Sequence, residues 1–163
     1  MNRNLAKPIY MKKGRLNNSF SFWENIGTSD CILSVIKDGY RIPLLNCPPK
    51  MCLSNNKSSL ENSIFVEKAI LDLLKGSLVK SVSNRPHVIN PLIVSFNGKG
   101  KARLILDFRH VSKHVHLDTF KFEDWKTLKQ YVNLNSNGFG FDLKSGYHHV
   151  DIHKSFQAYL GFS

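Results

Sequence analysis

An Asn-Gly pair between two runs of β-favouring residues constrains the fold of this chain more than any other feature. Asn97 and Gly98 separate the runs 91–96 and 101–107. Both central residues of a type I′ turn need positive φ, so this pattern predicts an antiparallel hairpin. Alternation along the second run predicts an apolar face made of Ala102, Leu104 and Leu106. The opposite face carries Lys101, Arg103, Ile105 and Asp107. Such a hairpin buries one face and offers cations to phosphates on the other.

Helical periodicity occurs on both sides of this hairpin. Thr28 or Ser29 can cap a short helix that Gly39 ends, and Gly76 ends a second helix over about 62–75. A third helix is predicted over 123–133, with its apolar residues directed inward: Trp125, Leu128 and Val132. Short strands are predicted at 78–82, at 139–143 and in the last residues, 159–163. Helices packed on short antiparallel strands make the expected fold class α+β.

The composition excludes several classes of protein. The chain has 163 residues, of which 42% are hydrophobic, which is too apolar for a disordered chain. No apolar run approaches the ~20 residues of a membrane helix, and no signal-peptide h-region follows Met1. The expectation is an intracellular protein without a membrane partner, cytoplasmic or nuclear and not secreted. Three cysteines without a C-x-x-C pair favour unpaired thiols over a zinc half-site at Cys47 and Cys52.

Positive charge is concentrated in two segments. The formal net charge is +11 at pH 7. Residues 1–18 contain five cations and no acid, and residues 84–116 contain six cations and one acid. We interpret 1–18 as a basic flexible leader. The second segment predicts a surface directed at polyanions, although a solvated basic face would give the same count.

Asp142 is the acid with the most unusual surroundings. It stands between Phe141 and Leu143, where an unpaired carboxylate would be costly. Alternation in a strand places Asp142 and Gly140 on the face opposite the neighbouring apolar residues, a position suited to a divalent-cation ligand. A turn or helix-cap role for this aspartate is equally compatible with the spacing.

Two blocks of the sequence resemble one family of enzymes. The block Phe141-Asp142-Leu143-Lys144-Ser145-Gly146-Tyr147-His148-His149-Val150-Asp151-Ile152, with the following 156–162, resembles the first catalytic motif of retroelement reverse transcriptases. Upstream, 76–79, 90–94 and 101–109 resemble the fingers segment of the same family. The order and spacing of the blocks agree with that family, and the residues of the motifs are most similar to those of retrotransposon polymerases. The resemblance covers about residues 60–163.

The resemblance implies a function for individual residues. Asp142, with the Leu143 carbonyl, would hold catalytic Mg²⁺; Tyr147 would lie under the sugar of the incoming nucleotide; and Arg103 would contact its triphosphate. Lys101 is a further nucleotide-binding candidate, since the lysine that the family often has before the hairpin turn is absent here. Template and primer would be contacted by Lys99, Arg85 and Arg109, although Arg109 also suits an ordinary ion pair with Asp107. RNA or DNA template-primer and deoxynucleoside triphosphates are the implied partners.

The same resemblance implies an incomplete polymerase. We expect a leader (1–18), a fingers-like subdomain (19–137) and the beginning of a palm (138–163), which together form part of a right-hand polymerase fold truncated at its C-terminus. The family's later motif contains two adjacent aspartates, and this sequence has no Asp-Asp pair. The chain alone is therefore expected to lack polymerase activity. Two alternatives remain: a non-catalytic basic nucleic-acid-binding module, or a degenerate remnant of a retroelement.

Overall fold

The computed structural model describes residues 16–119, 121–140, 142 and 146–163. These residues form a mixed α+β structure with two small sheets, one parallel and one antiparallel. The helices are α1 (Phe20–Asn25), α2 (Asp30–Asp38), α3 (Lys57–Glu61), α4 (Ser63–Lys75), α5 (Arg109–Ser112) and α6 (Trp125–Leu128). The strands are β1 (Met51–Cys52), β2 (Val88–Ile89), β3 (Leu92–Phe96) and β4 (Ala102–Leu106). Short 3₁₀ helices occupy Asn17–Ser19, Gly146–His149 and Lys154–Tyr159.

The two longer helices confirm the sequence-based predictions. Ser29 precedes α2, and Gly39 ends it with φ +91°. Only glycine adopts this conformation readily, which explains why the helix ends there. The other predicted helix, 62–75, is α4, which Gly76 ends as expected. Within the described ranges, no helix is long and apolar enough to cross a membrane.

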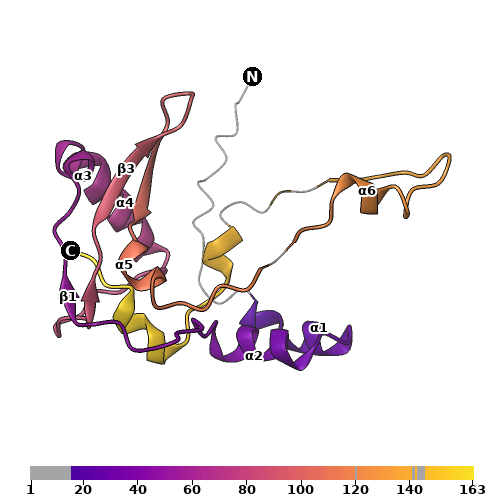
Figure 1. The fold of residues 1–163 in the computed structure, drawn as a ribbon, viewed down its shortest axis with the longest axis horizontal. Coiled ribbons are helices and arrows are strands. Elements are labelled where there is room, and N and C mark those ends of the chain that lie inside the picture. The colour runs from indigo at the N-terminus through magenta and orange to yellow at the C-terminus, as the bar shows by residue number, and fades with distance from the viewer. Residues whose placement is uncertain (1–15, 120, 141, 143–145) are drawn as a thin grey trace, which may run out of the picture.

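The β3–β4 hairpin forms the predicted antiparallel pair. Its register runs from Leu92 opposite Leu106 to Phe96 opposite Ala102. The core cluster consists of Val66, Leu92 and Val94, with Phe65, Ile70, Ala102, Leu104, Leu106 and Phe162 packed against it. The alternation predicted for 102–106 is therefore confirmed, because the apolar side chains of β4 contact this core. In Figure 1, α3 and α4 lie beside the hairpin, and the hairpin turn projects beyond them.

Segments distant in sequence are joined beside the hairpin. The parallel β1–β2 pair aligns Met51 with Val88 and Cys52 with Ile89. Ile89 also forms a parallel bridge with Gly161, and Tyr40 forms one with Ile152. These bridges attach residues near the end of the chain both to the segment before the hairpin and to the end of α2.

Four predicted elements were wrong. Residues 78–82 form no strand, although Leu78 and Val79 are half-buried. The helix predicted over 123–133 is restricted to α6, and its supposed inward residues are exposed: Trp125, Leu128 and Val132. Phe139, Gly140 and Asp142 belong to no strand, whereas Phe141 and Leu143 lie outside the described residues. The strand predicted over 159–163 is also absent, because Tyr159 ends a 3₁₀ helix and Gly161 makes only an isolated bridge with Ile89.

Of the proposed subdivisions, residues 1–15 of the basic leader lie outside the described residues. Asn17, near the end of that segment, donates through Nδ2 to the carbonyls of Ile36 (3.3 Å) and Lys37 (3.2 Å). These bonds occupy carbonyls at the end of α2, where the helix itself provides no partners. The boundaries at 18, 137 and 138 remain predictions.

Candidate nucleic-acid interface

The turn between β3 and β4 is organised by Asn97. Its N–H donates to the Lys101 carbonyl (3.1 Å), and its own carbonyl accepts from Gly100 (2.8 Å). Its side-chain Oδ1 accepts from the backbone N–H groups of Lys99 (3.1 Å) and Lys101 (2.8 Å). Gly100 has φ +71°, whereas Gly98 has no positive φ. The expected two-residue type I′ turn was therefore wrong: the loop has three residues, and Gly100 takes the left-handed position.

This turn and β4 present cations on an outward face. Lys99, Lys101 and Arg103 are exposed, and Arg103 pairs across the hairpin with uncharged Ser95. The only acid of the segment 97–107 is Asp107, which is 7% exposed. Its burial corrects the expectation that it shares the outward face. The face therefore has three cations and no exposed carboxylate, so it attracts anions.

Asp107 and Arg109 form the strongest ion pair near the hairpin. The Asp107 carboxylate accepts from Arg109 Nε (2.8 Å), from a terminal guanidinium nitrogen (2.6 Å) and from the Arg109 backbone N–H (3.2 Å). The side-chain hydrogen bond from Arg109 lowers the pKa of Asp107 to about 2, and burial opposes this shift. The same bond raises the pKa of Arg109. Arg109 is therefore already engaged, as the ion-pair interpretation predicted, and it presents only its remaining N–H groups to solvent.

The pKa of Asp107 leads to a prediction about acid stability. A carboxyl whose pKa falls on folding stabilises the fold above its unfolded-state value, near 3.8 here. That stabilisation should disappear as the pH falls from about 4 to about 2. Urea unfolding across this pH range should show the difference in free energy of unfolding between wild type and Asp107→Asn shrinking with acidification. A difference that is constant with pH would contradict this assignment.

The structure does not place the remaining predicted site residues in contact with the hairpin face through any hydrogen bond or ion pair among the described residues. Arg85 is exposed in the loop before β2, and Asp142 is also exposed. Tyr147 is 96% exposed in the 3₁₀ helix Gly146–His149, while Leu143 lies outside the described residues. No hydrogen bond or ion pair in the described part of the chain joins Asp142 or Tyr147 to Arg103.

The residues that could ligate a metal are also not brought together. Among the described residues, no group of three or more His, Cys, Asp or Glu side chains is placed to hold a metal ion. Cys47 and Cys52 are free and exposed. The Cys47 sulfur lies 3.5 Å from the Tyr159 hydroxyl and 4.0 Å from His87 Nε2. Its hydrogen bond with Tyr159 raises the pKa of that tyrosine.

Asn90 is the most important residue that sequence reasoning missed. It is fully buried, and its Nδ2 donates to the carbonyls of Tyr159 (2.8 Å) and Gly161 (3.1 Å). Its backbone N–H also donates to Gly161 (2.8 Å). The sequence places Asn90 only at the start of the block 90–94 that resembles the fingers segment, and assigns it no contact. Nothing in the sequence around it indicates a partner about seventy residues away.

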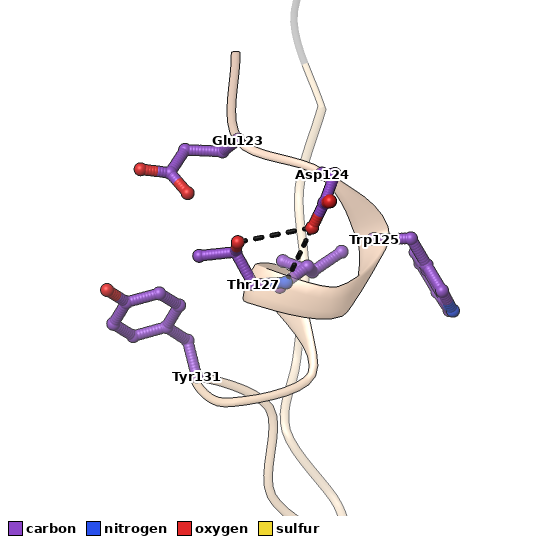
Figure 2. Close-up of a pocket in the computed structure, with 6 residues that line it drawn as sticks. Glu123, Asp124, Trp125, Thr127 and Tyr131 are labelled. Carbon is purple, nitrogen blue, oxygen red and sulfur yellow. Dashed lines mark hydrogen bonds between the residues drawn. The ribbon is translucent and has the colours of Figure 1, made fainter. Parts of the chain in front are cut away.

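A hollow lies elsewhere, on an arm formed by residues 121–140. It has a volume of about 340 Å³ and is lined by Glu123, Asp124, Trp125, Thr127, Leu128 and Tyr131. Asp124 Oδ1 accepts from the Thr127 N–H (3.0 Å) and hydroxyl (3.2 Å), as Figure 2 shows, and the backbone bond lowers the pKa of Asp124. Trp125 and Tyr131 point away from each other in this view, so they do not enclose a ligand between their rings.

Comparisons of the chain with protein-family models, with curated proteins and with solved structures find no match. The outward face of the hairpin, which we call the cationic face (Lys99, Lys101 and Arg103), is the best-defined candidate site.

Proposed function

We propose that this chain is part of a retroelement reverse transcriptase, and that its cationic face binds the phosphates of template-primer and incoming nucleotide. One observation carries the proposal: three exposed cations stand on a hairpin whose opposite face is fixed in the core. Placing cations on a rigid element lowers the entropic cost of holding them against a phosphate. The sequence resemblance gives the same hairpin to the nucleotide-binding fingers.

A second observation supports the family assignment. The two blocks that resemble reverse transcriptases are far apart in sequence, and Asn90 connects them through its bonds to Tyr159 and Gly161. Phe162 also packs against the core cluster beneath the hairpin. Blocks that serve one active site need a common support, and this packing provides one.

The divalent metal of the polymerase reaction does not fit the described residues. Two-metal nucleotidyl transfer needs several carboxylates to hold two ions about 4 Å apart. Asp142 is exposed, and no cluster of three ligating side chains surrounds it among the described residues. We therefore assign phosphate binding to this chain and derive no metal-dependent step.

Charge reversal on the cationic face tests the proposal. The double variant Lys101→Glu/Arg103→Glu should bind a fluorescent RNA–DNA template-primer about 10–100-fold more weakly at 50 mM salt, because two phosphate contacts are lost. Its slope of log affinity against log salt should be shallower by about 2. Fluorescence anisotropy over 50–200 mM salt measures both quantities.

A matched variant provides the control. Lys37 and Arg41 are exposed at and after the end of α2, and Figure 1 shows the helix α2 far from the hairpin turn. Lys37→Glu/Arg41→Glu makes the same change in net charge, so it should weaken binding much less. Equal losses in the two double variants would mean that only total charge matters, and would refute a site on the hairpin.

Nucleotide dependence separates a polymerase from a basic nucleic-acid-binding module. A polymerase-type face should bind template-primer more tightly when the deoxynucleoside triphosphate complementary to the next template base is present, and Arg103→Ala should abolish this gain. A module that binds only the backbone should respond equally to all four nucleotides. The second result would remove the polymerase assignment and leave nucleic-acid binding intact.

A further inference from the structure

The outer edge of β4 has unpaired backbone groups. In an antiparallel pair, alternate residues direct their N–H and C=O groups toward the partner strand. Lys101 and Asp107 direct their backbone groups toward β3. The Lys101 carbonyl accepts from the Asn97 N–H (3.1 Å), and the Asp107 N–H donates to the Pro91 carbonyl (2.8 Å). The residues between them that share this direction are Arg103 and Ile105. The backbone groups of Ala102, Leu104 and Leu106 therefore point away from β3, and no described residue hydrogen-bonds to them.

The corresponding edge of β3 is covered. Leu92 N–H donates to Asn55 Oδ1 (2.8 Å), and the Leu92 carbonyl accepts from the Asn56 N–H (3.1 Å) and the Ser59 hydroxyl (2.8 Å). Val94 N–H donates to the Ser58 hydroxyl (3.1 Å). Residues at and before α3 thus bond to the β3 edge at Leu92 and Val94, and Figure 1 shows α3 on that side of the hairpin. In the described structure the β4 edge has no partner at any of its three outward residues, whereas the β3 edge is bonded at Leu92 and Val94.

An open edge strand is a template for another extended chain. Proteins usually protect such an edge, and those that leave it open commonly use it to bind a peptide by strand addition. The side chains beside this edge select among possible occupants. Lys101 and Arg103 are exposed along one face, together with Ile105, which is 42% exposed. On the other face, Ala102, Leu104 and Leu106 are half-buried apolar residues.

We propose that the β4 edge binds an extended acidic segment of a partner protein, which adds a third strand to the hairpin. Side chains of an added strand alternate between the two faces. The complementary segment therefore alternates Glu or Asp, placed beside Lys101 and Arg103, with apolar residues placed beside the half-buried apolar row of β4. A second copy of this chain fits poorly, because both β4 strands would bring their cations to one sheet. This inference goes beyond nucleic-acid binding and does not depend on it.

A synthetic peptide tests the proposal directly. A fluorescent seven-residue peptide alternating Val and Glu should bind the full chain, whereas a peptide alternating Val and Lys should not. With Lys101→Glu/Arg103→Glu this preference should reverse, because the sign of the neighbouring charges has changed while the backbone edge is retained. Absence of the reversal would overturn the proposal.

Backbone readouts distinguish strand addition from simple charge attraction. Amide hydrogen exchange at Ala102, Leu104 and Leu106 should slow when the Val/Glu peptide is bound, whereas Arg103 and Ile105 are already bonded to β3 and should change little. A nucleic acid attracted to the same cations gives no such alternating pattern. If the peptide binds without slowing the three outward amides, β4 is not the docking edge.

One substitution removes a hydrogen-bond donor from the β4 edge with little change in side-chain size. Ala102→Pro removes an outward N–H that bonds to nothing in the described structure, and an edge strand tolerates this change. Ala102→Val retains the N–H and serves as the control. We expect peptide affinity to fall about tenfold or more for proline relative to valine, since a backbone bond is lost and the ring obstructs the edge. Equal affinities would refute strand pairing, and template-primer affinity reports separately whether the cationic face is intact.

Discussion

Replacing Gly39 by alanine is expected to destabilise the fold by about 3 kcal/mol or more, which is a large part of the 5–15 kcal/mol typical of a domain. Gly39 has φ +91° and ψ 158°, a conformation that residues with a Cβ rarely adopt. A Cβ here would lie 2.7 Å from His153 N and 2.9 Å from the Ile152 carbonyl carbon. Both the backbone strain and the collision with neighbouring backbone oppose the substitution. Urea unfolding followed by circular dichroism measures the loss.

The chain contains controls that separate these two costs. Gly27 also has positive φ, +74°, but a Cβ there meets nothing within 4 Å, so Gly27→Ala reports the conformational cost alone. Gly98 has open space and no positive φ, so Gly98→Ala should be nearly neutral. The expected order of destabilisation is Gly39→Ala, then Gly27→Ala, then Gly98→Ala. A loss at Gly39 no greater than that at Gly27 would show that the contact with 152–153 is not close in solution.

The collision at Gly39 matters because that contact joins distant parts of the chain. Tyr40 N–H donates to the Asp151 carbonyl (2.7 Å), and His153 N–H donates to the Tyr40 carbonyl (3.0 Å). The sequence predicted Gly39 as a helix stop, which is a local role. Its second role, allowing another backbone segment to approach, depends on where 151–153 pass, and no local pattern contains that information.

The elements predicted correctly are those determined by local interactions. Helix α2 follows from an apolar stripe and a terminal glycine, and the hairpin follows from period-2 alternation around a turn. Arg103 was placed on the outward face by that alternation alone. Asp107 does not follow that alternation, because β4 ends at Leu106. The guanidinium of Arg109 then makes burial of the Asp107 carboxylate favourable.

The failed predictions concern segments that need a partner. Residues 78–82 have β-favouring side chains, but a strand forms only where another strand can pair with it, and Ser77 turns the chain with φ 57°. The helix predicted over 123–133 is wrong for a related reason. Short isolated helices are marginal in water, and in the described structure the apolar stripe of this segment packs on no core, so only α6 persists around the Asp124 cap.

The substitution Asn90→Asp should be among the most destabilising single changes, with a loss on the order of 3–5 kcal/mol at pH 7, because it buries an unpaired charge. The side chain keeps its shape, but an oxygen replaces the Nδ2 that donates to the Tyr159 and Gly161 carbonyls. Those carbonyls and burial raise the pKa of the introduced carboxyl above its unfolded value of about 3.9. The loss should therefore shrink as the pH falls toward 4, where the carboxyl protonates.

Controls for Asn90→Asp make its cause identifiable. Asn84→Asp adds the same charge at an exposed position of the preceding loop and should be nearly neutral. Asn90→Ala removes the donor without adding charge and should cost about 1–3 kcal/mol, with no recovery in acid. If Asn90→Asp showed no recovery on acidification, the buried-charge explanation would fail. Recovery would show that Asn90 holds the 159–161 segment beside the hairpin. Template-primer binding then tests whether the cationic face depends on this attachment. If it does, Asn90→Asp should lose binding at pH 7 and Asn84→Asp should not.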